Sequence, residues 1–235
     1  MTSTTLPAAS SIFGTKTIVI DTTVPVISSV SPSTNSTVLN ANVGYTLSEA
    51  IASGNVEYTR TGGTTDTNSP HTANLAGAEL NAGERASAAL TNAPTLVSGT
   101  IYSIAFNGTD AAGNAASAVT VTGVTFDTTA PTVASFTTAT ATGSYNADEA
   151  IVITANTSEA IQNDNTITVT LNTGNTVVLT APSAGTTLVG TYTVGAGDTS
   201  AGLTVTSFTI GTVADTVGNA MSSTTLPAAS SIFGT

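Results

Sequence analysis

The sequence contains no cysteine and no tryptophan, and only three of its 235 residues are lysine or arginine. Without cysteine the chain can form neither disulfides nor thiolate metal sites. Because phosphate contacts need clustered basic side chains, and fourteen acidic residues give the chain a net charge of −11, we expect no nucleic-acid partner. No apolar run approaches the roughly 20 residues of a membrane helix, so we expect no membrane insertion of this segment.

What the sequence does contain indicates β-structure. Threonine, serine, alanine, valine and glycine are abundant, the mean hydropathy is +0.27, and valine, isoleucine and threonine alternate in many short runs. This alternation is typical of half-buried strands and argues against a disordered chain. No segment shows the pattern of a long helix. We therefore predict an all-β fold.

One motif occurs twice and divides the chain. Residues 18–25 read IVIDTTVP and residues 124–131 read VTFDTTAP, so an apolar run ends on an aspartate and a proline follows four residues later. The proline interrupts ladder hydrogen bonding, which suits a crossing point between two sandwich domains. We predict two tandem β-sandwich domains, at residues 21–126 and 127–235, each of about seven short strands.

The two ends of the sequence are nearly the same. Residues 1–15 and 221–235 match at fourteen of fifteen positions, with Met1 aligned to Met221. A fixed period of 220 residues (221 − 1) is typical of a tandem array, although a duplication made in cloning would give the same pattern. In an array, residues 1–20 are the tail and last strand of a preceding repeat domain. The counterpart of residues 16–20 would then close the second domain, which we expect to lack its own last strand.

Strands are expected where β-branched and aromatic residues alternate between turn residues. In the first domain these runs are 25–30, 38–47, 55–60, 86–96, 99–106 and 118–126, and residues 62–85 are undetermined. In the second domain they are 131–136, 150–155, 166–171, 176–179, 187–194 and 203–210. The alternation within residues 99–106 places Tyr102, Ile104 and Phe106 on one face of the sheet.

This strand order gathers acidic side chains at one end of each sandwich. If the first strand leaves the preceding domain, the second strand returns to it, and the loop before the last strand lies at the same end. The expected oxygen donors are Asp21, Glu49, Asp110 and Asn114 in the first domain, and Asp127, Glu159, Asp215 and Asn219 in the second. Carboxylate and amide oxygens suit Ca²⁺, which takes about six to eight oxygen ligands. The sequence therefore predicts a calcium site at the end of each domain that faces the preceding one.

An alternative role for these aspartates stays open. Asp110 and Asp215 each begin a five-residue motif, DAAGN and DTVGN, whose glycines are Gly113 and Gly218. Such residues can stabilise their own loops through Asx-turns, with glycine supplying the required backbone angles, and need no metal.

Taken together, the motifs resemble a known family. The order DAAGN at 110–114, a closing strand and DTTAP at 127–131 is similar to the bacterial immunoglobulin-like repeats of very large secreted adhesins and surface proteins. The second domain adds SEA at 158–160, LNTG at 171–174, DTVGN at 215–219 and TLP at 225–227. The resemblance implies an immunoglobulin-like, calcium-associated spacer fold outside the cell, with no catalysis of its own.

Nothing else in the sequence favours an enzyme. His71 is the only histidine and lies in a Pro-His-Thr segment, where we expect a surface loop residue, because a triad or a histidine-rich metal site needs further partners. The predicted function is a structural repeat unit of an extracellular stalk, fibre or filament whose partners are neighbouring copies of the same repeat. The alternatives are a filament assembled by strand donation from residues 16–20 and a ligand-binding adhesion module.

Overall fold

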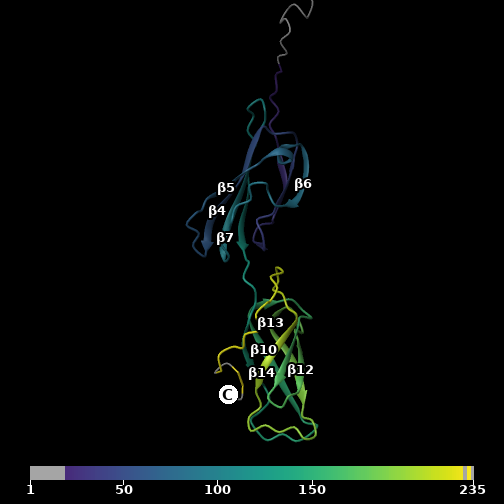
Figure 1. The fold of residues 1–235 in the computed structure, drawn as a ribbon. Coiled ribbons are helices and arrows are strands. Elements are labelled where there is room, and N and C mark those ends of the chain that lie inside the picture. Colours follow the sequence, from purple (N-terminus) through teal and green to yellow (C-terminus); the bar gives the residue numbers. More distant parts are fainter. Residues whose placement is uncertain (1–18, 230–231, 234–235) are drawn as a thin grey trace, which may run out of the picture.

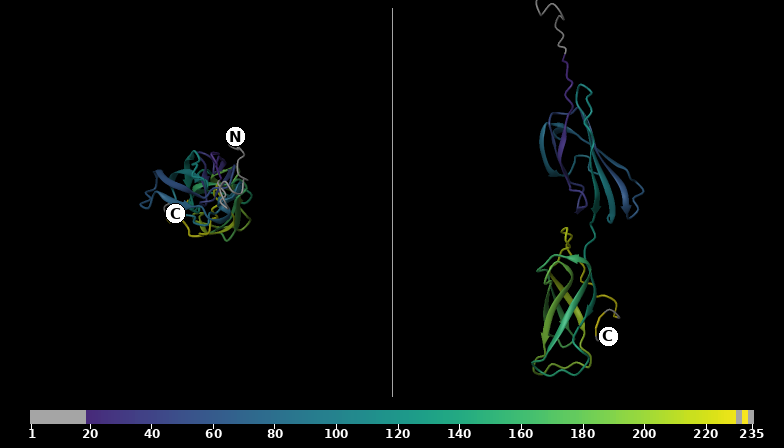
Figure 2. Two further views of the ribbon diagram at one scale, coloured as in Figure 1. Left: turned by 90° about the horizontal axis from the view of Figure 1, so that it is seen from above. Right: turned by 180° about the vertical axis from the view of Figure 1, so that it is seen from behind.

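The computed structural model describes residues 19–229 and 232–233, which form two β-structured domains lying end to end (Figures 1 and 2). The first domain comprises β1 (Ile27–Ser31), β2 (Thr37–Val38), β3 (Val43–Leu47), β4 (Ser53–Gly63), β5 (His71–Asn74), the 3₁₀ helix η1 (Gly77–Leu80), β6 (Gly83–Ala88), β7 (Thr100–Thr109) and β8 (Val119–Phe126). The second domain comprises β9 (Val133–Thr137), β10 (Ala150–Ile161), β11 (Thr166–Leu171), β12 (Thr176–Thr180), β13 (Gly185–Thr193) and β14 (Val205–Thr212).

Both domains follow one strand plan. In the first, a three-stranded sheet of order β1-β3-β6 packs with a five-stranded sheet of order β2-β8-β7-β4-β5. In the second, β9-β10-β13 and β12-β11-β14 repeat these orders, and pairing of β12 with β13 joins them into one continuous sheet. Within the described residues, β8 has no strand counterpart in the second domain. The structure confirms the prediction of an all-β fold of two β-sandwich domains, and the described residues provide no last strand for the second.

Each domain has its own apolar core. The buried apolar residues of the first core lie between Ile27 and Phe126, and those of the second between Val133 and Ile232. Along β7 the burial alternates, with Tyr102, Ile104 and Phe106 fully buried, as the sequence pattern predicts. The period of two in β-branched and aromatic residues therefore determines which face of each sheet turns inward.

Two expected strands differ from the structure. The run 38–47 is divided, because the segment between β2 and β3 crosses from one sheet to the other and turns where the Asn42 amide donates to Asn40 Oδ1 at 3.1 Å. The run 86–96 continues β6 only as far as Ala88. Beyond it, the amide and the hydroxyl of Thr91 both donate to Glu79 Oε1 (2.6 and 2.9 Å), which ties this segment to η1 instead of a sheet.

The segment 62–85, undetermined from sequence, contains the end of β4, β5, η1 and the start of β6. Residues 1–18, which include most of the tail and strand expected at residues 1–20, lie outside the described part of the chain. Among the described residues, no helix has the length and apolar character needed to cross a membrane.

Candidate metal centres

The loop before β8 holds its aspartate by backbone hydrogen bonds. Asp110 Oδ1 accepts from the amides of Ala112 (2.9 Å) and Asn114 (2.8 Å), and the side chain of Asn114 donates to Asp110 Oδ2 at 2.8 Å. Gly113 sits at φ 95°, a left-handed conformation that glycine adopts without strain. The sequence DAAGN therefore fixes the Asp110 carboxylate in one orientation.

The loop after β14 repeats this geometry. Asp215 Oδ1 accepts from the amides of Val217, Gly218 and Asn219 (2.9, 2.7 and 2.8 Å), and the side chain of Asn219 donates to Asp215 Oδ2 at 2.7 Å. Gly218 has φ 106°. Both aspartates are buried, with 5% of Asp110 and 2% of Asp215 exposed. The Asx-turn role expected for these residues is therefore present in both loops.

A serine positions the glutamate of each domain. The Ser48 hydroxyl accepts from the Val26 amide (2.9 Å), and the Ser48 amide donates to the Val26 carbonyl (3.0 Å). In the second domain, Ser158 makes the same two bonds with Thr132 (3.0 and 2.9 Å). These bonds hold the Ser-Glu dipeptide against the segment that follows the first aspartate, so the glutamate lies beside that aspartate.

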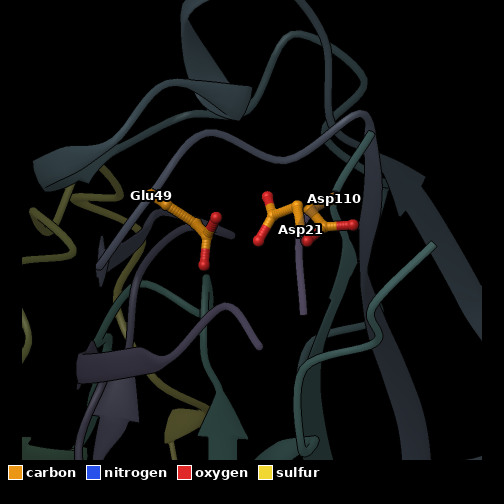
Figure 3. Close-up of side chains that lie close together, drawn as sticks. All are labelled: Asp21, Glu49 and Asp110. Carbon is orange, nitrogen blue, oxygen red and sulfur yellow. The ribbon is translucent and has the colours of Figure 1, made fainter. Parts of the chain in front are cut away.

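Each set of three carboxylates converges. One oxygen from each of Asp21, Glu49 and Asp110 lies within 4.8 Å of the others, and the same holds for Asp127, Glu159 and Asp215. Figure 3 shows the first group, in which the three side chains point toward one another from three separate segments. The structure thus brings together all six carboxylates that the sequence singled out, three at one end of each domain. We call these groups the first and second acidic clusters.

Within each cluster the pKa of the glutamate and the pKa of the buried aspartate are shifted in opposite directions. Burial, together with the charges of Asp21 and Asp110, raises the pKa of Glu49 above its ordinary value, and burial with Asp127 and Asp215 raises that of Glu159. For Asp110, donation from the side chain and amide of Asn114 outweighs burial and lowers the pKa. Each cluster therefore combines a carboxylate held as an anion with a glutamate whose ionisation is opposed by its surroundings.

Asp215 behaves as Asp110 does. Burial opposes its ionisation, but the side chain and amide of Asn219 and the amides of Gly218 and Val217 together lower its pKa. Glu49 has a further feature, because its Oε1 is shielded from solvent and has no hydrogen-bond partner. A shielded carboxylate oxygen without a donor is the kind of atom that a bound cation would satisfy.

The two asparagines lie against the aspartates of their clusters. Asn114 Nδ2 donates to Asp110 Oδ2 and to the backbone carbonyl of Asp21 (2.8 and 3.2 Å), and Asn219 Nδ2 donates equivalently to Asp215 and Asp127. Since both neighbours are acceptors, only the amide nitrogen can face them. The asparagines therefore tie the segment that enters each domain to the aspartate loop through their amide nitrogens.

The second acidic cluster lies at the joint between the domains. The Ser98 hydroxyl of the first domain contacts Asp127 Oδ1 (3.4 Å) and Thr129 Oγ1 (3.0 Å) and accepts from the Thr128 amide (3.0 Å). Asp127 Oδ1 also accepts from the Thr129 amide at 2.9 Å. The carboxylate of Asp127 is thus shared between the cluster and the inter-domain contact.

Sequence reasoning missed a polar network inside the first domain. His71 Nε2 lies 2.6 Å from Asp66 Oδ2, and the Tyr102 hydroxyl donates to the same oxygen at 2.7 Å. Hydrogen bonds from His71 and Tyr102 lower the pKa of Asp66 despite its burial. The expectation of a surface loop histidine is wrong, because His71 begins β5 and its side chain is only 13% exposed. Asp66 lies in segment 62–85, for which the sequence indicated no strands. The nearby His71 was the one residue in this network that the sequence singled out.

One comparison with known proteins agrees with the architecture of the first domain. The domain built from β1 to β8 is a β-sandwich with an acidic cluster at one end. Residues 21–128 match the family model described as "Bacterial Ig-like domain", so this part of the chain is a bacterial immunoglobulin-like domain. No curated protein matches the sequence.

Among solved structures, the crystal structure of Streptomyces avermitilis α-L-rhamnosidase complexed with L-rhamnose is similar at 12% identity and a TM-score of 0.29. The alignment covers 88% of this chain but only 26% of that one.

Proposed function

We propose that this chain is a structural repeat unit of an extracellular bacterial stalk, fibre or filament, in which calcium bound at the acidic clusters stiffens the joints between domains. Bacterial immunoglobulin-like domains are typical of surface and extracellular proteins, which supports the location. The chain acts as a spacer with no catalytic step. Its partners are neighbouring copies of the same repeat, in one chain or in a homopolymer.

The observation that carries the calcium proposal is the repetition of one carboxylate geometry in two domains. Oxygens bound to one Ca²⁺ lie about 2.3–2.6 Å from it, so two of them are at most about 5 Å apart. Both clusters satisfy this limit, since their oxygens lie within 4.8 Å of one another. Three carboxylates can supply part of the shell, and backbone carbonyls and water can supply the rest.

The negative charges of the cluster carboxylates also support a bound cation. Three carboxylates that lie this close repel one another, and the raised pKa values of Glu49 and Glu159 express this repulsion together with burial. A divalent cation would offset the repulsion and satisfy the shielded Oε1 of Glu49. Asp110 and Asp215 would be the preorganised ligands, because their loops already hold them ionised.

Stiffening would follow from the place of Asp127. Its carboxylate belongs to the second cluster and also contacts Ser98 of the first domain. A cation held by Asp127, Glu159 and Asp215 would fix the segment that enters the second domain relative to the sandwich it enters. Removing this rotational freedom at every joint would make an array of such domains a rod instead of a flexible chain.

The test is calcium titration of the chain and of the E49Q/E159Q double variant, which removes one charge from each cluster at nearly constant volume. We expect the wild type to bind Ca²⁺ by calorimetry, and its melting temperature and its maximum dimension in X-ray scattering to fall in chelator. The double variant should bind at least tenfold more weakly. E84Q, at an exposed position of β6, is the control and should behave as wild type. Equal melting temperatures and dimensions with calcium and with chelator would refute the proposal.

A further inference from the structure

Tension along the chain acts on the first domain from opposite ends. The segment 19–26 enters this domain at the end remote from the second domain, and β8 leads out of it into the joint (Figure 1). A pull on a stalk of such domains is therefore applied to the entering segment in one direction and to β8 in the other. The contacts between these two parts of the chain determine how the domain responds.

The entering part of the chain and β8 are bonded directly to each other. The entering segment continues through β1 into β2, and β2 pairs in parallel with β8, Thr37 with Thr125 and Val38 with Phe126. Three backbone hydrogen bonds of 2.9 Å surround these pairs: the Asn35 amide donates to the Thr122 carbonyl, the Thr125 amide to the Ser36 carbonyl and the Asp127 amide to the Val38 carbonyl. We call these contacts the exit pairing, because they lie where the chain leaves the domain.

Because its two strands are parallel, tension loads the exit pairing in shear. β2 is pulled at its first residue, toward the entry, and β8 at its last residue, toward the joint, so the two strands are drawn past each other along their own axes. The hydrogen bonds of parallel strands are evenly spaced along the ladder, so they share this load and have to break together. Strands pulled apart from the same end would instead lose their bonds one after another. Since forced unfolding is governed by the unfolding rate, simultaneous rupture should need the larger force.

A bulge in β8 makes room for this pairing. The register of β8 against β7 slips by one residue between Val121 and Val124. Gly123 lies in this bulge at φ 72°, and a Cβ atom there would collide with Asn35 Oδ1, so glycine lets the turn before β2 lie against β8. Val124 and Phe126 of the same strand are buried. The core therefore keeps water from one side of the exit pairing.

We infer that the first domain resists extension of the chain, and that the exit pairing is the element that carries the load. This function differs from the stiffening of the joints, because stiffening limits bending between domains, whereas the exit pairing limits unfolding under tension. Every hydrogen bond of the exit pairing joins backbone groups, so the resistance needs no calcium. The source of the tension rests on the proposed stalk, but the resistance belongs to this one domain and is measured without metal.

Pulling the full chain in two directions with optical tweezers tests the inference. The chain has no cysteine, so a pair of introduced cysteines defines where the force acts, and Thr22, Ser117 and Thr128 are exposed. In T22C/T128C the force acts along the exit pairing, whereas in T22C/S117C it acts on the entering segment and on the start of β8, at the same end of the domain. In chelator and at one pulling speed, we expect the first domain of T22C/T128C to unfold at a force at least about twofold higher. Equal unfolding forces in the two directions would overturn the inference.

Removing one bond of the exit pairing provides the second measurement. Thr125→Pro deletes the amide that donates to the Ser36 carbonyl, so the force along the exit pairing should fall by at least about a third while the force in the T22C/S117C direction is unchanged. Ile104→Ala, which weakens the buried core, is the control for lost stability and should lower both forces. An unchanged axial force in T125P, or an equal fractional loss in both directions, would overturn the inference. The comparison of the two directions leaves the exit pairing intact, so it is decisive even if T125P fails to fold.

Discussion

Asn219 joins two segments that lie 92 residues apart: its Nδ2 donates to the backbone carbonyl of Asp127 at 3.1 Å and to Asp215 Oδ2 at 2.7 Å. In the first domain Asn114 makes the same two bonds, to Asp21 and Asp110. The entry of each domain is thus tied to the loop that ends the sandwich. The asparagine acts on the acidic cluster through position, by keeping two aspartates at a fixed separation.

Replacing this clamp should loosen the second domain. Asn219→Ala removes two hydrogen bonds at a buried position, so we expect a loss of about 1–3 kcal/mol in the free energy of unfolding, measured by urea denaturation in chelator. Asn163→Ala, at an exposed asparagine, is the control and should change the value by less than about 0.5 kcal/mol. If N219A matches N163A, the clamp contributes nothing to stability.

The glutamates should have opposite effects with and without metal. In chelator, Glu159→Gln removes a carboxylate that is destabilised by burial and by Asp127 and Asp215, so the second domain should melt at a higher temperature. In saturating calcium the same variant loses a ligand and should melt below wild type. Differential scanning calorimetry under both conditions measures this reversal of sign. A variant that melts below wild type in both would indicate a purely structural glutamate.

The pH dependence should also change sign with calcium. Because the pKa of Glu159 is raised in the folded state, the folded protein binds more protons than the unfolded chain between the two pKa values. In chelator this contribution therefore makes the protein more stable as pH falls through the raised pKa. In calcium the site must be deprotonated, so affinity falls over the same range, while the lowered pKa of Asp215 keeps that ligand ionised. Thermal melts and calcium titrations from neutral pH to pH 4.5, compared with E159Q, separate the two trends.

Much of this architecture could be predicted from local sequence. The runs of β-branched residues locate β11 and β12 to within a residue because each strand alternates in burial and is flanked by turn residues. The convergence of Asp21, Glu49 and Asp110 follows from the antiparallel order of strands alone. These features depend on the spacing of apolar, turn and acidic residues along the chain, and this spacing can be read from a single sequence.

What could not be predicted depends on contacts between distant residues. At residues 39–42, and where Thr91 bonds to Glu79, side-chain hydrogen bonds replace the backbone hydrogen bonds of a sheet. No local sequence pattern shows where such a replacement occurs. The orientation of Asn114 follows from the two acceptors that face it, which only the fold brings together. Asp66 was missed for the same reason, since its partner Tyr102 is 36 residues away.

The Asp66 network gives a prediction that separates hydrogen bonding from charge. Tyr102→Phe removes a donor to the buried Asp66 carboxylate and should cost about 1–3 kcal/mol in the first domain at neutral pH. Because the pKa of Asp66 is lowered in the fold, its ionised form stabilises the domain above the ordinary aspartate value. This stabilisation is lost as pH falls through the lowered pKa, so the deficit of Y102F should shrink on acidification.

Tyr58→Phe is the matched control for this experiment. The Tyr58 hydroxyl is as deeply buried but donates to the neutral carbonyl of Ala41 at 2.9 Å, so the deficit of Y58F should not depend on pH. Denaturation curves of both variants at pH 7 and pH 3 provide the comparison. Parallel pH profiles for the two variants would show that the charge of Asp66 plays no part.

Finally, the two cores should unfold separately, because among the described residues the joint is crossed by a few hydrogen bonds, those of Ser98 and that from the Asp127 amide to the Val38 carbonyl, and no buried apolar cluster spans it. Leu188→Ala removes a fully buried side chain from the second core and should cost about 2–5 kcal/mol. Only the calorimetric transition of the second domain should move, whereas Ile104→Ala should move only that of the first. Val178→Ala, at an exposed apolar position, controls for side-chain loss and should leave both in place. A single transition shifted by either core variant would mean that the joint couples the domains more strongly than its hydrogen bonds suggest.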